Sequence, residues 1–434
     1  MLAAAGRDCA PARCAASDTG SEAYRVVDRR RPLATLTRTT PTSEGHRATT
    51  FELLFDLVYV FAATQVTALM ADQHSPHGVA QGLILLALLW SVWSGYTYLA
   101  NVARADEGLL RVGMATAMAS IFIVALTIPE AFHDSPGGLN GPIVLVSAYL
   151  FVRCIHLGLF TIAARGDRGL RHQVRLAWVP LLAAAAFMIP GALLGGVAQT
   201  ALFATALLLD WGGHWLSARY GSWRVPRAGH LAERHGLFVI LAIGESVISI
   251  GVGASQQAIS TPLLAAAVLG LALAILLWWL YFDTTALAAE HRLIHTRGPA
   301  RVRMGEAYTY GHYPIIAGII TAALGVEGVL AHADQAEPLG GFYAAALYGG
   351  LALYLAGHLL FRRLTGSGWA TPRAVTAVAL LALLPIAASI AALAALLLAL
   401  ITLASLVTYE TLHDAEQRRA LRGHDSPLPN QPTG

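Results

Sequence analysis

Long apolar runs follow one another along this chain, and each has the length of a segment that crosses a lipid bilayer. A helix of about 20 apolar residues spans the hydrocarbon core, and it satisfies its own backbone hydrogen bonds there. We therefore predict an all-α, polytopic membrane protein with about twelve transmembrane helices. The last two runs have no polar loop between them, but Pro385 and their combined length favour a tight hairpin over one span. The runs lie at about 51–70, 79–100, 112–131, 143–164, 176–194, 199–217, 231–252, 262–285, 306–330, 340–361, 373–389 and 392–411.

The composition agrees with a membrane protein and does not indicate a nucleic-acid partner. Hydrophobic residues make up 56% of the chain and charged residues 13%, whereas about a quarter of the residues in a soluble domain are charged. All 29 basic residues are arginines, and many of them lie in short loops between apolar runs. We attribute the net charge of +3 to membrane topology, and we expect no binding of nucleic acid.

Arginine-bearing loops alternate with loops that carry no arginine. Because arginine-rich loops stay in the cytoplasm, this alternation predicts an even number of spans with both termini cytoplasmic. Residues 1–48 are predicted to form a disordered cytoplasmic tail, and residues 414–434 a second cytoplasmic tail. The loops without arginine are 71–78, 132–142, 253–261 and 331–339.

The two halves of the chain resemble each other in the order of several polar and aromatic residues. We therefore predict two six-helix repeats, at 49–229 and 230–413. An even number of spans in each repeat keeps both in the same orientation, so the expected symmetry axis lies along the membrane normal. The matching positions are Glu52 with Glu233, Trp93 with Trp278, Tyr96 with Tyr281, Arg111 with Arg301, His156 with His358, and Asp210 with Glu410.

Charged residues stand in the first turns of the first and seventh runs. Glu52 and Asp56 are four residues apart and share one helical face, and Glu233 and His235 begin the seventh run. Acids there could simply stabilise helix N-termini, by about 0.3–1 kcal/mol each. Alternatively the two helices face each other, and these side chains line a cytoplasmic vestibule that binds a cation or relays a proton. The sequence leaves both interpretations open.

Glu245 lies deep in the seventh run, with apolar residues on both sides. Inserting an acid at the centre of a span costs about 2.5–3.5 kcal/mol on insertion scales, so such a residue is usually functional. Its counterpart in the first run is Thr64, next to Gln65, which predicts a polar layer at one depth. The alternative is a structural hydrogen bond between helices. Small residues on the same helix are expected to allow close backbone approach, namely Gly244, Gly251 and Gly253.

Arg153 is predicted to be the only arginine within a span, so it needs an acidic partner. The candidates are Asp56, Glu245 and Asp210. A structural ion pair and a clamp for a substrate carboxylate fit this position equally well.

Three segments carry a resemblance to a known family. They are FELLFDLVYVFAATQVT in the first run, HLAERHGLFVILAIGESVI around the seventh, and Trp278 to Asp283. Together they resemble the bacterial low temperature requirement A family over nearly all of Thr49 to Glu410. The resemblance implies a multi-pass protein of the bacterial inner membrane, and it supplies no reaction. Separately, Phe55 to Thr64 resembles the first helix of the six-helix-repeat potassium channels of endosomes and lysosomes.

We therefore predict a proton-coupled secondary transporter or ion pathway in the bacterial inner membrane, with a small solute, proton or cation as its partner besides the lipid bilayer. The alternatives are a cation channel built from the two repeats, and a membrane enzyme or accessory protein without a transport function. We expect no catalytic residues, metal ion or cofactor, and the oligomeric state stays open. The residues expected along the path are Glu52, Asp56, Gln65, Arg153, Glu233, His235 and Glu245.

Overall fold

A computed structural model describes residues 48–220, 223–255, 257–335 and 337–413, and these residues form helices and no strand. The prediction of an all-α protein is confirmed. The predicted tails, residues 1–48 and 414–434, lie outside the described residues apart from Ala48.

Six long helices form each half of the described chain. In the first half they are α2 (Thr50–Gln73), α3 (Pro76–Val102), α4 (Gly108–Thr127) with the 3₁₀ turn Ile128–Glu130, α5 (Gly141–Ala163), α6 (Arg168–Leu194) and α7 (Gly196–Tyr220). In the second half they are α8 (Ala228–Ser255), α9 (Thr261–Leu280), α11 (Gly298–Ala331), α13 (Gly350–Leu364), α14 (Thr371–Ser389) and α15 (Ala392–His413). Shorter elements continue or precede them: the π-helical turn Tyr281–Thr285, α10 (Ala286–His295), α12 (Gly341–Ala344) and the π-helical turn Ala345–Gly349.

Eleven of the described helices are long and apolar enough to cross a membrane. The twelfth long helix, α7, is not among them, although it has 25 residues. It carries Gln199 and Asp210 in otherwise apolar sequence, and these lower its mean hydropathy. A total of twelve spans therefore stays a prediction. The predicted hairpin between the last two runs is confirmed, because α14 ends at Ser389 and α15 begins at Ala392.

Side-chain caps fix where several helices begin. Thr49 accepts a hydrogen bond from the backbone N–H of Glu52, whose carboxylate accepts from Thr49 in return, and this forms a capping box at the start of α2. Ser75, Asn140 and Ser260 each accept a backbone N–H three residues ahead at the starts of α3, α5 and α9. Such caps are worth about 0.5–2 kcal/mol each, so these starts follow from local sequence.

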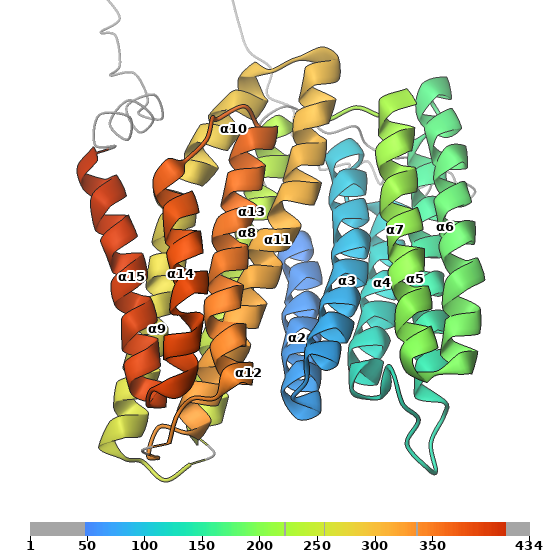
Figure 1. Cartoon of the computed structure of the whole chain (residues 1–434). Coiled ribbons are helices and arrows are strands. Elements are labelled where there is room, and N and C mark those ends of the chain that lie inside the picture. Colours follow the sequence, from blue (N-terminus) through green and yellow to red (C-terminus); the bar gives the residue numbers. More distant parts are fainter. Residues whose placement is uncertain (1–47, 221–222, 256, 336, 414–434) are drawn as a thin grey trace, which may run out of the picture.

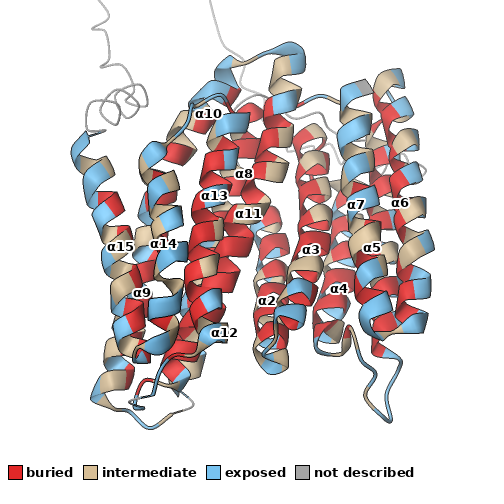
Figure 2. Cartoon of the chain, viewed as in Figure 1, coloured by how far each residue is buried: buried red, intermediate tan, exposed pale blue. Residues whose placement is uncertain are grey.

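The helices run side by side as one bundle, with the first half on one side and the second half on the other (Figure 1). Helices α3 and α11 and the segment Gly341–Leu364 that contains α13 are the most enclosed, with 72%, 83% and 72% of their most apolar stretches buried, against 22% for α14. Buried residues accordingly gather in the middle of the bundle (Figure 2). The outward faces carry exposed apolar side chains such as Leu182, Leu208 and Val268, as expected for helices surrounded by lipid tails.

The two halves meet where α2 and α3 pack against α8 and α11. Within each half, the first long helix packs on the second and third, the third on the fourth, the fourth on the fifth, the fifth on the sixth, and the second on the sixth.

Glycines bring α11 and α13 unusually close together. A Cβ atom added to Gly318 would collide with the backbone of Tyr354, and one added to Gly350 would collide with the backbone of Ala322. Small residues at such an interface allow backbone-to-backbone packing, which drives helix association in membranes. The prediction that glycines of α8 have this role was wrong for Gly244 and Gly251, because nothing lies within 4 Å of a Cβ there. A Cβ at Gly253 would meet only the side chain of Leu330, at 3.7 Å.

We predict that Gly318→Ala destabilises the protein by about 1–3 kcal/mol, because the added methyl group meets immobile backbone. Gly244→Ala is the matched control in an open position, and it should be neutral or stabilising by up to about 1 kcal/mol through helix propensity. Thermal unfolding of both variants in detergent measures the difference. Equal melting temperatures would contradict the close packing of α11 on α13.

Candidate functional site

Two pairs of charged side chains join α2 to α8 in the middle of the bundle. Arg234 on α8 donates through Nη1 and Nη2 to both carboxylate oxygens of Asp56, at 2.6 and 2.7 Å. His230 Nε2 lies 2.9 Å from Glu52 Oε1. The indole N–H of Trp93 on α3 donates to Asp56 Oδ1 at 2.8 Å. We call these five residues the ion-pair cluster.

The ion-pair cluster is closed to solvent. Asp56 is 0% exposed and Arg234 1%. Charges at such a depth are tolerated only when they are paired and hydrogen-bonded, because desolvating an unpaired ion costs several kcal/mol. The bidentate geometry of Arg234 satisfies this requirement and fixes the two helices at one relative height.

The predicted vestibule residues divide into two groups. Glu52 and Asp56 face α8, as the second interpretation required, but His230 and Arg234 bind them there. Glu233 is half-buried and accepts the backbone N–H of Ala48 at 3.1 Å. His235 points inward, where its Nδ1 bonds to the Leu231 carbonyl oxygen. None of these side chains lines the cavities described below.

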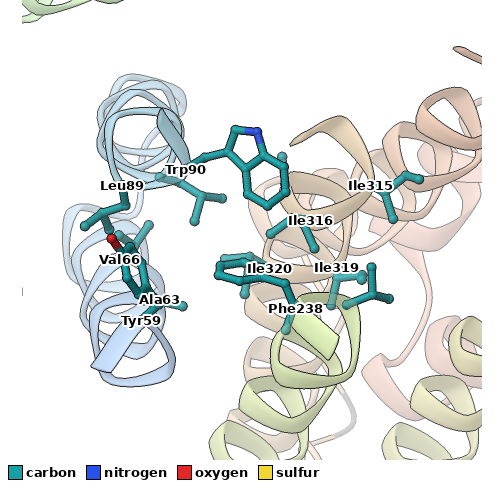
Figure 3. Close-up of a cluster of buried hydrophobic side chains, with 14 of the residues drawn as sticks. Tyr59, Ala63, Val66, Leu89, Trp90, Phe238, Ile315, Ile316, Ile319 and Ile320 are labelled. Atoms are coloured by element: carbon teal, nitrogen blue, oxygen red, sulfur yellow. The ribbon is translucent and has the colours of Figure 1, made fainter. Parts of the chain in front are cut away.

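An apolar layer lies next to the ion-pair cluster, one helical turn further along α2 and α8. Phe238 packs against the rings of Trp90 and Trp93, with centroids 5.3 and 4.4 Å apart. Figure 3 shows this layer, in which Tyr59 and Ala63 approach Phe238 and Ile320 from the opposite side. The space left there is about 20 Å³, so the layer separates the cluster from what lies beyond it.

Glu245 lies beyond the apolar layer and is fully buried, at 0% exposure. Its Oε1 accepts hydrogen bonds from Thr67 on α2 at 3.2 Å and from Ser249 at 2.8 Å. Its Oε2 has no hydrogen-bond partner, and no ion pair involves Glu245 among the described residues. A carboxyl group without a cation in such a place favours the neutral, protonated form.

The contacts between α2 and α8 keep one register. Three hydrogen-bonded pairs are each separated by 178 residues along the chain: Glu52 with His230, Asp56 with Arg234, and Thr67 with Glu245. A constant separation means that the two helices run parallel. Positions 52, 56, 63 and 67 follow each other at intervals that keep one face of a helix toward α8.

The prediction that Thr64 and Gln65 form the polar layer with Glu245 was therefore wrong. The contact comes from Thr67, whereas Thr64 turns back to bond the Val60 carbonyl oxygen. Gln65 is half-buried and takes no part in the hydrogen bonds of Glu245. Thr67 lies 11 residues, about three helical turns, after Asp56, so both side chains point to the same face of α2. The alignment of the two runs did not take this into account.

Arg153 on α5 forms a second buried ion pair, with Asp210 on α7. Arg153 Nη2 lies 2.7 Å from Asp210 Oδ1, so Asp210 is the partner among the three candidates. His214 Nδ1 is 3.4 Å from the same oxygen. This pair lies beside a cavity of about 110 Å³ that Arg153, His156 and Asp210 help to line.

Sequence reasoning missed the other buried arginines. Arg153 was expected to be the only arginine within a span, yet Arg234 and Arg373 are each 1% exposed. Arg373 pairs with Glu410 and also bonds His358. One available signal was the four-residue spacing of His230 and Arg234, which matches that of Glu52 and Asp56.

Arg153, Asp56 and Glu245 therefore occupy three separate places, and no single chamber contains all three. Among the described residues, no group of three or more histidine, cysteine or acidic side chains is placed to hold a metal ion.

Comparisons with known proteins agree with this architecture. A family model described as bacterial low temperature requirement A protein matches residues 47–408. An uncharacterized protein of Rhizobium meliloti (strain 1021) is 31% identical over 333 residues, which cover 72% of this chain and 76% of that protein. No solved structure matches the chain.

We predict that Arg234→Met destabilises the protein by about 3–5 kcal/mol, because Asp56 is then buried without a cation. The double variant Asp56→Leu with Arg234→Met should recover most of this loss, since both charges are removed together. Thermal unfolding in detergent compares the two variants. If the single variant is as stable as the unchanged protein, the pair does not hold the halves together.

Proposed function

We propose that this chain, which belongs to the bacterial low temperature requirement A family, is a proton-coupled secondary transporter of the bacterial cytoplasmic membrane. The family name refers to growth in the cold and specifies no reaction. The proposal therefore depends on the geometry of the buried charged groups.

The observation that carries the proposal is the environment of the Glu245 carboxyl group. Its carboxyl group is completely buried at the contact between the two halves, has two hydroxyl donors, and has one oxygen without a partner. Ionising it in this position requires a conformation that admits water or a cation. A group that binds a proton in one conformation and releases it in another is the minimum that proton coupling needs.

The apolar layer supports a carrier over a channel. A channel between α2 and α8 needs a continuous polar lumen, whereas Tyr59, Phe238 and Ile320 fill the space between the ion-pair cluster and Glu245. In a carrier, the two halves move against each other and expose the central site to each side in turn. The ion-pair cluster would be the contact that holds one end of the junction closed.

The parallel packing of α2 on α8 supports the proposed pair of six-helix repeats. A two-fold axis along the membrane normal leaves equivalent helices parallel, whereas inverted repeats make them antiparallel. The constant separation of 178 residues is the parallel case. The same pairs of helices also pack in each half.

A rapid pH step tests the coupling site without a known substrate. In proteoliposomes on a solid-supported membrane, the step should drive a transient current, because protons reach Glu245 through part of the membrane. Glu245→Gln should reduce the transferred charge to the level of empty liposomes, since the amide binds no proton. Glu337→Gln, at an exposed position in the loop before α12, is the control and should keep the current.

Two results would contradict this proposal. An unchanged transient in Glu245→Gln would remove Glu245 from the proton path. A steady current under a constant gradient would indicate a channel instead of a carrier.

Reporter fusions test the predicted topology. If α7 crosses the membrane, the twelve spans place both termini in the cytoplasm, where fused green fluorescent protein fluoresces and fused alkaline phosphatase stays inactive for lack of disulfides. If α7 does not cross, the remaining eleven spans place the termini on opposite sides. Fusions at both ends of the full chain distinguish the two cases.

A further inference from the structure

We propose that the cavity beside Arg153 binds a small organic anion, a carboxylate on a single-ring aromatic or similarly compact apolar body. Identifying this anion as the transported solute rests on the proposed function, but its binding does not. We call the cavity of about 110 Å³ the chamber.

The walls of the chamber suit an apolar ring. Aromatic side chains from four helices line it: Tyr98, Phe160, Trp211 and Tyr310. An engineered cavity of about 150 Å³ in another protein takes up benzene; the chamber is somewhat smaller, at about 110 Å³, so a single ring is the largest apolar body that we expect it to take up. Aromatic rings contact one another favourably in tilted and edge-on geometry.

The charged end of the chamber has unused donors. Arg153 gives Nη2 to Asp210, but its Nε has no partner although the side chain is 3% exposed. His156 Nε2 also has no partner at 5% exposure, and it donates in the tautomer that carries the proton there. Guanidinium groups bind carboxylates strongly through two parallel N–H donors, especially where water is excluded. A carboxylate at this end would accept a hydrogen bond from the unpartnered Arg153 Nε, whereas Asp210 Oδ2, which also has no partner, can only accept.

A wider cavity adjoins the chamber. It has a volume of about 970 Å³ and shares Ala218, Val302 and Glu306 with the chamber, and we infer that the two connect there. We call it the mouth. Arginines surround it, on the side of the loops that the sequence assigns to the cytoplasm: Arg219, Arg224, Arg301 and Arg303.

The charges along this route favour an anion. Chamber and mouth together are lined by five arginines and by two carboxylates, Asp210 and Glu306. A cleft lined mostly by one sign of charge concentrates ligands of the opposite sign and speeds their entry. Arg224 lies 3.5 Å from Asp167 and keeps 73% of its side chain exposed at the rim, where an incoming anion can compete for it.

The other half of the protein contains a comparable buried ion pair, Arg373 with Glu410, that has only a structural role. Arg373 there donates to both oxygens of Glu410 and to the Leu280 carbonyl oxygen, and it also bonds Thr285 and His358. Its hydrogen-bonding capacity is used within the protein, and it lines neither the chamber nor the mouth. Arg153 has the same kind of partner but keeps a donor free beside open space.

The test is ligand binding by the full-length protein in lipid nanodiscs, followed by ¹⁹F NMR. The probe is 4-fluorobenzoate, compared with its neutral isostere 4-fluorobenzamide and with the cation 4-fluorobenzylammonium. We expect saturable broadening of the benzoate signal beyond that seen with empty nanodiscs. The amide and the cation should bind roughly tenfold or more weakly, because each lacks the charge-assisted hydrogen bond to Arg153.

Three variants locate the site. Arg153→Gln with Asp210→Asn replaces the ion pair by a neutral pair and should weaken benzoate binding by roughly tenfold or more. Arg373→Gln with Glu410→Gln makes the matched change in the other half and should leave binding unchanged. Ala218→Trp closes the passage between mouth and chamber without changing any charge, and it should abolish binding even if the first variant folds poorly.

Each alternative result overturns the inference. Equal binding of benzoate and the amide would show an apolar cavity without charge selection, and preference for the benzylammonium would assign the site to cations. Binding that survives Ala218→Trp would place the probe elsewhere. None of these results depends on Glu245, so the coupling proposal stands or falls separately by the pH-step experiment.

Discussion

The buried pair of Asp56 and Arg234 is the interaction on which the arrangement of the two halves depends. Each charge alone is intolerable in an apolar interior, so each helix is stable at this depth only beside the other. The bidentate contact, with the hydrogen bond from Trp93, fixes both distance and height. The hydrogen bonds of Glu52 with His230 and of Thr67 with Glu245 have the same separation of 178 residues.

This register places three different environments along one helix pair. Paired charges come first, a layer of aromatic and aliphatic side chains follows, and a lone carboxyl group lies beyond it. Separating the paired charges costs free energy, because each ion is then left buried without its partner. The last is a group whose charge state depends on whether water reaches it. The junction is held by ion pairs at one level, and at another it contains a carboxyl group that can change its charge. Such a junction is suited to motion of the two halves between two conformations, as the proposed carrier needs.

Three of the four buried arginines, all except Arg227, form ion pairs with acidic side chains and yet differ in what they do. Arg234 joins the halves, Arg373 is fully hydrogen-bonded within the second half, and Arg153 keeps a free Nε beside an aromatic-lined chamber. Neither residue type nor burial distinguishes them. What differs is whether the surrounding helices supply enough acceptors and whether they leave space next to the guanidinium group.

Much of the architecture could be predicted from the sequence, because the length and spacing of apolar runs follow directly from helix geometry and the demands of a bilayer. The sequence likewise determined that Glu52 and Asp56 share a helical face, and that Glu245 lies among apolar residues. It could not say that Arg234 rather than a loop arginine meets Asp56, that Thr67 rather than Thr64 meets Glu245, or that Arg153 chooses Asp210. Helical periodicity fixes which residues share a face, whereas the neighbour of that face and its relative height come only from the packing of helices that are far apart in the chain.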